Sequence, residues 1–464
     1  MTGVVCVAGL GVSGTAAARV LAERGERVVV VEAAEGERQR AAAEELARHG
    51  VEVRFGTAEL PEGTVRLVTT GWAPHHPLIS AALAAGVEVV GEVELAWRLR
   101  GPQPAPWLAL TGTNGKTTVV RMLTSMLLAA GRKAAAVGNV GVPVVEAVAE
   151  PYDVLAVELS SFQLHWSSTL APHAAAILNI APDHLDWHGS MEAYAAAKAK
   201  IYERAGVVVY NADDPRTVQA ASPYLDDDAA GGPRVAGFTL GVPRPGQLGV
   251  VEDLLVDRAF VEDPLRRAEE LATLADVRPL APHNVANALA AAALARSLGV
   301  PPHAVRQGLL DFRPDPHRMA HVDRVGGVDY VDDSKATNPH AAAAALAAYP
   351  SIVWVAGGQL KGADVEDLVR QAAPRLRGAV LIGADRARIA EALARHAPNV
   401  PVVDIAERDT GVMDRVVTEA ARLASPGDTV LLAPAGASLD MFENYPARGE
   451  AFARAVRTLK RQAS

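Results

Sequence analysis

Short apolar runs alternate with longer Ala-rich segments along the chain. The runs at residues 4–9, 27–32, 51–55 and 65–71 are rich in valine, and Ala, Glu and Arg dominate the segments between them. The valine-rich composition is typical of buried β-strands, whereas Ala, Glu and Arg are good helix formers. Strands that alternate with helices predict βαβ units, in which helices cover both faces of a parallel sheet.

Two proline-rich breaks divide this pattern into three parts, at residues 98–107 (RLRGPQPAPW) and 310–319 (LDFRPDPHRM). Apolar runs resume after the first break at 107–112, 134–139, 154–161, 174–180 and 207–214, and after the second at 328–338, 351–358, 379–383 and 428–438. Residues 283–299 predict an Ala-rich helix, and the polar, Gly-containing stretch 223–238 predicts a loop between edge strands. We therefore predict an α/β protein of three successive domains, at residues 1–100, 101–314 and 315–464.

Composition narrows the classes of function. Half of the 464 residues are hydrophobic and 21% are charged, which is typical of a water-soluble globular protein. No apolar run approaches the ~18–20 residues that span a bilayer, and the N-terminus lacks the basic region of a signal peptide. The net charge of −9, without a dense Lys/Arg run, argues against nucleic acid as the main partner. The single cysteine, Cys6, has no partner within the chain and favours a reducing cytoplasm.

Residues 108–120 (LALTGTNGKTTVV) read as strand, Gly-rich turn and helix. Gly112 and Gly115 allow backbone N–H groups to face an anion at a helix start, Lys116 can reach the terminal phosphates and the Thr117 hydroxyl can bind Mg²⁺. Leu110 stands where the longer G-x-x-x-x-G-K-[ST] pattern has its first glycine. The motif predicts a nucleotide phosphate site, and the alternative is a plain β–α turn with an exposed lysine.

Acidic and basic residues follow the next strands. Glu158 ends one apolar run, and Asp183 and His184 follow another. Because ligands bind at the carboxyl ends of parallel strands, these residues predict a Mg²⁺ site beside the phosphate loop. The alternative interpretations are that Glu158 is a solvated carboxylate at a strand end and that His184 has a structural role. Lys198 and Lys200 lie on a short predicted helix. The alternative to a role in this site is that both lysines are solvated at the surface.

A second Gly-rich turn opens the chain. Gly9, Gly11 and Gly14 match G-x-G-x-x-G after a strand, and Glu32 ends the next strand. This pattern is typical of dinucleotide sites, in which the acid binds a ribose. It suggests an NAD(P)-linked oxidoreductase as an alternative function, although nothing further along the chain resembles a dehydrogenase.

Six segments together resemble the Mur ligase superfamily over nearly the whole chain. They are LTGTNGKTT, VELSSFQL, NIAPDHLDWHGSMEAYAAAKAKIY, HNVANALAAAALA, the His-Arg pair at 317–318 and DDSKATNP. The DDSKATN segment is similar to that of the D-glutamate-adding branch. The resemblance implies Rossmann-like first and third domains around a central P-loop ATPase-type parallel sheet.

The same resemblance implies an ATP-dependent amide ligase of cytoplasmic peptidoglycan precursor synthesis. It would add D-glutamate to UDP-N-acetylmuramoyl-L-alanine through an acyl phosphate, with two Mg²⁺ ions and a carbamylated lysine at Lys198. We expect a monomer with no membrane insertion. Other amide ligases of the superfamily, such as an L-alanine-adding or a folylpolyglutamate synthase-like enzyme, and an inactive nucleotide-binding scaffold remain alternatives.

Roles for individual residues follow from the resemblance. The expected catalytic residues are Lys116, His184 and Lys198. The expected ATP-binding residues are Gly112, Thr113, Asn114, Gly115, Lys116, Thr117, Thr118, Asn287, Arg318 and Asp333, and the expected Mg²⁺ ligands are Thr117, Glu158, His184 and Lys198. The expected contacts of the uridine nucleotide are Val12, Ser13, Glu32, Thr69, Gly71 and Asn139. The expected residues around D-glutamate are Lys335, Thr337, Lys361, Ser438, Leu439 and Tyr445.

The resemblance implies that the two Gly-rich turns bind different ligands. We expect the turn at residues 112–117 to bind ATP and the turn at residues 9–14 to bind UDP. Ala33 and Ala34 stand where the family commonly has Thr and Arg, so the uracil contacts there are open. The DDSKATN loop offers a cation and two hydroxyls that can bind a small dicarboxylate through hydrogen bonds. The alternative interpretation of this loop is a helix cap with a solvated lysine. Because the ligands lie on different domains, we expect a hinge near residues 310–316.

Overall fold

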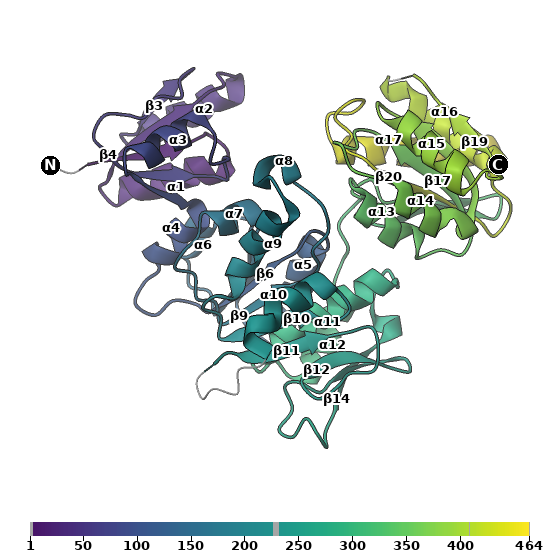
Figure 1. Cartoon of the computed structure of the whole chain (residues 1–464), viewed down its shortest axis with the longest axis horizontal. Coiled ribbons are helices and arrows are strands. Elements are labelled where there is room, and N and C mark those ends of the chain that lie inside the picture. The colour runs from purple at the N-terminus through teal and green to yellow at the C-terminus, as the bar shows by residue number, and fades with distance from the viewer. Residues whose placement is uncertain (1–2, 226–231, 408, 464) are drawn as a thin grey trace. The chain divides into compact units, whose positions relative to one another are not determined.

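Figure 1 shows the computed structural model of the chain, which describes residues 3–225, 232–407 and 409–463. The chain divides into two compact units. The first comprises residues 1–180, 184–277 and 285–312, and the second comprises residues 181–183, 278–284 and 313–464. The strands form three sheets, two in the first unit and one in the second. The predicted α/β fold class is confirmed.

The first sheet has five parallel strands in the order β3-β2-β1-β4-β5. Its central strands are almost wholly buried, which explains their unbroken valine runs. The elements are β1 (Val4–Ala8), α1 (Val12–Glu23), β2 (Arg27–Glu32), α2 (Glu37–Ala47), β3 (Glu52–Phe55), β4 (Thr64–Thr69), α3 (Pro77–Ala84), β5 (Glu88–Gly91) and α4 (Glu92–Leu99).

The second sheet has nine strands in the order β14-β13-β12-β11-β10-β9-β6-β8-β7, antiparallel only at β12–β13 and β13–β14. Its elements up to β10 are β6 (Trp107–Thr111), α5 (Lys116–Ala129), β7 (Ala134–Gly138), α6 (Val144–Ala147), β8 (Val154–Glu158), α7 (Ser161–His165), β9 (Ala174–Ile177), α8 (Leu185–His188), α9 (Met191–Ala199) and β10 (Val207–Asn211). The remainder are α10 (Pro215–Leu225), β11 (Arg234–Phe238), β12 (Gln247–Val251), β13 (Leu254–Asp257), β14 (Glu269–Thr273), α11 (Pro282–Ser297) and α12 (Pro302–Asp311).

One prediction for this region was wrong in part. Of the stretch 223–238, predicted to be a loop, residues 223–225 end α10 and residues 234–238 form β11, while residues 226–231 lie outside the described residues. β11 lies inside the sheet, between β10 and β12. Pairing with two neighbouring strands satisfies the backbone hydrogen-bonding groups of β11, although the Gly and Pro content of this stretch had indicated a loop.

The Ala-rich helix α11 is confirmed, and its alanines have a structural role. Residues 288–295 are completely buried in the hydrophobic core of the central sheet. A helix that is apolar on all sides is suited to the interior, and small side chains allow close packing. The helix therefore fixes the position of Asn287, which lies just before the buried run.

The third sheet has six strands in the order β15-β16-β20-β17-β18-β19, with only β15 antiparallel. Its elements are β15 (Ala320–Val325), β16 (Val328–Asp332), α13 (Pro339–Leu346), β17 (Ile352–Gly357), α14 (Glu366–Ala372), β18 (Leu376–Ile382), α15 (Arg386–His396), β19 (Val402–Asp404), α16 (Met413–Leu423), β20 (Thr429–Ala435) and α17 (Tyr445–Ala463). Among the described residues, no helix combines the length and apolarity that crossing a bilayer requires.

Candidate active site

The phosphate loop joins β6 to α5 in the first unit. Gly115 has a φ of +84°, and a Cβ there would lie 2.5 Å from Oδ1 of Asn287, so the turn needs glycine for both conformation and space. This approach places Asn287 against the loop, and its ATP-binding role stays a prediction. The Nζ of Lys116 donates to the carbonyl oxygens of Gly112 and Thr113, each at 2.9 Å.

A residue that sequence reasoning did not identify holds this loop in place. Asn179, which follows β9, accepts the backbone N–H of Asn114 on its Oδ1 at 2.8 Å and donates to the carbonyl oxygen of Asn114 at 3.0 Å. Its own carbonyl oxygen accepts from the N–H of Thr113. Asn179 follows an apolar run and so lies at the ligand-binding edge of the sheet. This position was the signal in the sequence that could have identified Asn179 as a residue of the site.

Lys198 lies on α9 with its ammonium against the phosphate loop. The side chain is buried, and its Nζ donates to the carbonyl oxygen of Gly112 at 3.0 Å and to Oγ1 of Thr111 at 3.4 Å. It also lies 4.6 Å from the centre of the Tyr194 ring, whose hydroxyl is 3.0 Å from Oγ1 of Thr113. The structure therefore brings Lys116 and Lys198 to the same loop carbonyl.

Glu158 ends β8, the strand beside β6, and is completely buried. Its Oε1 accepts from Nδ2 of Asn139 at 3.0 Å, whereas its buried Oε2 has no hydrogen-bond partner among the described residues. Gly138 has a φ of +103°, and a Cβ there would overlap the Glu158 carbonyl oxygen, so this glycine is what lets Asn139 reach the carboxylate. An orphaned carboxylate oxygen beside a phosphate loop fits a hard divalent cation.

His184 is the second residue predicted to hold a metal ion. It is exposed, has a φ of +53° at the start of α8 and packs its ring 4.8 Å from Phe162. Within the described part of the chain, no group of three or more His, Cys, Asp or Glu side chains is placed to hold a metal ion. The roles of His184 and Lys198 as metal ligands therefore stay predictions.

The first Gly-rich turn is built by close backbone packing. Gly9 has a φ of +94° under the indole of Trp72, and a Cβ on Gly14 would overlap the carbonyl oxygen of Gly9. The carboxylate of Glu32 accepts the N–H of Leu10 on one oxygen and that of Ala34 on the other, each at 2.8 Å. Glu32 thus ties the turn to the end of β2.

The loop after β4 is tied to the segment that carries His184. Oγ1 of the buried Thr69 accepts the N–H groups of Gly71 and Trp72, which shapes this loop. The Gly71 carbonyl oxygen accepts from the indole of Trp187 on α8 at 3.3 Å. The Trp72 carbonyl oxygen accepts from the indole of Trp166 at 3.0 Å. Within the first unit, the predicted UDP-binding loop and the segment after β9 are therefore coupled.

In the second unit, Arg318 and Asp333 lie close enough to interact. Burial raises the pKa of the Asp333 carboxyl to about 7, although the Met319 N–H and the Arg318 guanidinium act in the opposite direction. The Nε of Arg318 is buried without a hydrogen-bond partner among the described residues, 3.7 Å from Oδ2 of Asp315. His317 places its Nδ1 2.6 Å from Oδ2 of Asp332.

The predicted D-glutamate residues come from loops at the carboxyl ends of β16, β17 and β20. The N–H of Ala435 donates to the Ala336 carbonyl oxygen at 2.9 Å, which ties two of these loops together. Lys335 places its ammonium 5.0 Å from the centre of the Tyr445 ring. The remaining predicted residues differ in exposure, since Ser438 is buried, Thr337 is half-buried, and Lys361 and Leu439 are exposed.

Arg448 on α17 connects these loops, and no sequence pattern identified it. Its side chain is 1% exposed. The guanidinium donates to Oγ and the carbonyl oxygen of Ser334 at 3.0 and 2.8 Å, and to the carbonyl oxygens of Gly436 at 3.1 Å and Gly357 at 3.5 Å. Burial lowers the pKa of this guanidinium to about 10. One buried cation therefore fixes the three loops relative to one another.

Comparisons with known proteins match residues in both units of the chain. The Mur ligase middle domain model matches residues 110–225, and the Mur ligase, glutamate ligase domain model matches residues 317–436. Two relatives named UDP-N-acetylmuramoylalanine--D-glutamate ligase are 63% identical over 461 residues in Thermobifida fusca and 64% identical over 463 residues in Streptomyces avermitilis. Each alignment covers 98% of both chains.

Solved structures show the fold at low sequence identity. A pseudomurein peptide ligase type C from Methanothermus fervidus has a TM-score of 0.60 at 18% identity, covering 99% of this chain and 100% of that one. UDP-N-acetylmuramate-alanine ligase MurC from Thermotoga maritima has a TM-score of 0.59 at 19% identity, covering 98% of this chain and 99% of that one.

Proposed function

Because the chain belongs to the Mur ligase family, we propose that it joins D-glutamate to UDP-N-acetylmuramoyl-L-alanine in an ATP-driven reaction. The observation that carries this proposal is the match, over nearly the whole chain, to relatives whose names state this reaction. The DDSKATN loop supports it, because it presents Lys335 beside Tyr445 at the edge where a dicarboxylate would bind. We place the reaction in cytoplasmic peptidoglycan precursor synthesis.

ATP and Mg²⁺ are the cofactors of the family, and the residues of this chain fit both. Glu158, with its unpaired buried oxygen, and the Thr117 hydroxyl, at the start of α5, are suitable oxygen ligands for Mg²⁺. When bound, Mg²⁺ offsets the repulsion between a substrate carboxylate and the triphosphate. Two Mg²⁺ sites, with His184 and a carbamylated Lys198 at the second, are part of the proposal.

The chemistry would proceed in two steps. The L-alanine carboxylate attacks the γ-phosphate of ATP to form an acyl phosphate, with ADP leaving. The D-glutamate amine then attacks the acyl carbon, and the tetrahedral intermediate collapses to the amide and inorganic phosphate. Positioning and charge neutralisation dominate such a reaction.

The chain's own groups supply that positioning. The N-terminus of α5 presents backbone N–H groups to the phosphates. Lys116, now held by two loop carbonyls, can turn its ammonium toward the terminal phosphate without moving the backbone. Asn179 can hold the loop backbone in place while the lysine turns, because it bonds to both backbone groups of Asn114.

Phosphate release with ATP, Mg²⁺ and UDP-N-acetylmuramoyl-L-alanine tests the proposal, with D-Glu, L-Glu, L-Ala and meso-diaminopimelate added separately. We expect release with D-Glu alone. Release with a different amino acid would keep the ligase chemistry and reject the D-glutamate assignment. No release with any of them, or with other acceptor nucleotides, would favour the inactive-scaffold alternative.

A further inference from the structure

The loop that follows β4 packs against aromatic side chains from the segments after β8 and β9. The indole N–H of Trp187 on α8 donates to the Gly71 carbonyl oxygen at 3.3 Å, and that of Trp166 donates to the Trp72 carbonyl oxygen at 3.0 Å. Gly71 has a φ of +111°, and a Cβ there would lie 3.3 Å from Cβ of Phe162. Two indoles therefore hold consecutive carbonyl groups of a loop that we assign to the uridine nucleotide.

The short helix α8 joins Trp187 to His184. The His184 carbonyl oxygen accepts the backbone N–H groups of Trp187 and His188, each at 3.1 Å. Nε2 of His188 lies 2.9 Å from Oγ of the buried Ser161, which holds the end of the helix. The ring of Phe162 lies 4.8 Å from the rings of both Trp187 and His184. A displacement of the Trp187 indole is therefore passed to His184 through the helix and the packed rings.

The position of His184 depends on how α8 is held. The residues before it, 181–183, belong to the second unit, so α8 is the segment that joins His184 to the rest of the first unit. His184 is exposed and has a φ of +53°, which is uncommon for a residue other than glycine. Within the first unit, the contacts of Trp187 and His188 thus determine where the imidazole of His184 lies.

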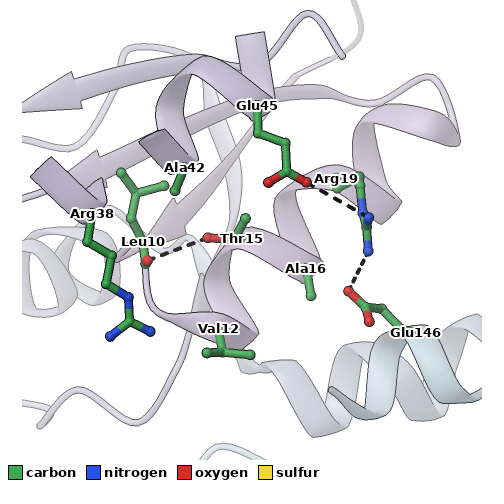
Figure 2. A pocket seen from close by; sticks show the side chains of 9 residues that line it. All are labelled: Leu10, Val12, Thr15, Ala16, Arg19, Arg38, Ala42, Glu45 and Glu146. Carbon is green, nitrogen blue, oxygen red and sulfur yellow. Dashed lines mark hydrogen bonds and ion pairs between the residues drawn. The ribbon is translucent and has the colours of Figure 1, made fainter. Parts of the chain in front are cut away.

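The first sheet is attached to the segments of the central sheet at other places, which do not involve α8. Figure 2 shows Arg19 of α1 paired with Glu146 of α6, at a distance of 2.5 Å. The buried Glu92, at the start of α4, accepts the Val145 N–H at 2.7 Å. Because these contacts remain when Trp187 is changed, a Trp187 variant tests the link through α8 and not the attachment of the sheet.

We propose that Trp187 is a positioning residue that couples the loop after β4 to His184. A nucleotide that contacts Thr69 and Gly71 moves the Gly71 carbonyl group, the Trp187 indole follows through its hydrogen bond, and α8 carries His184 with it. This inference rests on the proposed function, which assigns the uridine nucleotide to this loop and His184 to the reacting groups. A ligand can shift the position of His184 in this way only if it binds one arrangement of the loop better than another.

NMR of isotope-labelled histidine side chains in the full-length protein tests the coupling, with UDP as the ligand and without ATP or metal. UDP is used because it lacks the muramoyl and alanyl groups, which would themselves reach the reacting groups, and a His184→Ala spectrum assigns the His184 signals. We expect saturating UDP, established by calorimetry, to shift these signals in the wild type. Trp187→Phe keeps a ring against Phe162 but loses the N–H donor, and it should remove most of the shift.

Trp166→Phe is the matched control, because it removes the same kind of bond to the next carbonyl group of the loop from a residue outside α8. It should keep the UDP-induced shift of His184. In steady-state phosphate release with D-Glu, Trp187→Phe should lower kcat about fivefold, as loss of a hydrogen bond that positions a reacting group does. Trp166→Phe should raise the KM for the sugar nucleotide while kcat stays within about twofold of the wild type.

Three results would overturn the inference and leave the proposed function standing. The first is a wild-type protein whose His184 signals do not respond to saturating UDP, which requires no variant. The second is a response in Trp187→Phe equal to that of the wild type, and the third is a wild-type kcat in Trp187→Phe. Failure of the proposed function is recognised separately, in the wild type, by the absence of phosphate release with D-Glu and of any UDP binding.

Discussion

The carbonyl oxygen of Gly112 accepts hydrogen bonds from two lysines, Lys116 at 2.9 Å and Lys198 at 3.0 Å. Two ammonium groups that converge on one neutral acceptor repel each other, and the buried position of Lys198 strengthens that repulsion. A carbamate on Lys198 would replace one cation with an anion that has hard oxygen atoms. The local electrostatics therefore support the proposed modification.

Substitution of Lys198 tests this at the residue scale. Lys198→Ala should lower kcat at least about a hundredfold, as loss of a group that supports a bound metal does, and a small carboxylic acid should partly restore it. Lys200→Ala is the control, since the Lys200 ammonium donates to the His165 carbonyl oxygen and away from the phosphate loop. Wild-type activity in Lys198→Ala, measured by phosphate release, would reject the role.

At the scale of elements, α17 organises the loops that we assign to D-glutamate. The four hydrogen bonds of Arg448 join the ends of β16, β17 and β20, which are neighbours in the sheet although far apart in sequence. A guanidinium can make these bonds at once because its donors are fixed in one plane. The hydrogen-bond partners of Arg448 are Ser334, Gly357 and Gly436, and none of them is a predicted ligand-binding residue, so we regard Arg448 as a positioning residue.

Arg448→Met should leave these acceptors without their partner. We expect the free energy of unfolding to fall by about 2–4 kcal/mol, and the KM for D-glutamate to rise about tenfold with the KM for ATP nearly unchanged. Arg457→Met is the control, because Arg457 lies on the same helix with its side chain exposed. Arg448→Lys keeps the positive charge but lacks the planar set of donors. We therefore expect losses of stability and of D-glutamate affinity that are smaller than those of Arg448→Met. A folded Arg448→Met protein with the wild-type KM for D-glutamate would contradict the assignment.

At the scale of the whole molecule, the assigned ligands fall on different units. The phosphate loop lies in the first unit, while Arg318, Asp333 and the predicted D-glutamate loops lie in the second. The chain passes between the units at residues 312–313, within the predicted hinge, and also on both sides of 278–284. In that segment Ala281 lies in the core of the third sheet, and His283 is half-buried with its Nδ1 atom enclosed. Desolvation of the imidazole lowers the pKa of His283 to about 4.

Small-angle scattering tests whether the units approach each other. Because the reaction needs ATP, the sugar nucleotide and D-glutamate at one place, the radius of gyration should decrease when all ligands are present with a non-hydrolysable ATP analogue. D-glutamate alone should produce no such change. A scattering curve that stays the same with the complete ligand set would argue against closure.

Local pattern predicted much of the fold and part of the site. The valine runs indicated the strands β1, β2 and β4, because a buried strand in a parallel sheet must be apolar on both faces. The Gly-Lys-Thr turn indicated the phosphate loop, because its backbone geometry depends on residues that are adjacent in sequence. The strands β12–β14 at one end of the central sheet and the interior position of β11 were missed, since pairing rather than composition determines them.

Contiguous residues alone predicted most of the strands and helices, the phosphate loop and the resemblance to the family, because each of these depends on neighbouring positions in the chain. The three-dimensional arrangement was needed to show that Asn179 holds the loop, that Arg448 joins three loops and that, among the described residues, one oxygen of Glu158 has no hydrogen-bond partner. These properties depend on which distant segments meet. Burial and hydrogen-bond satisfaction arise from that meeting, and no local pattern encodes them.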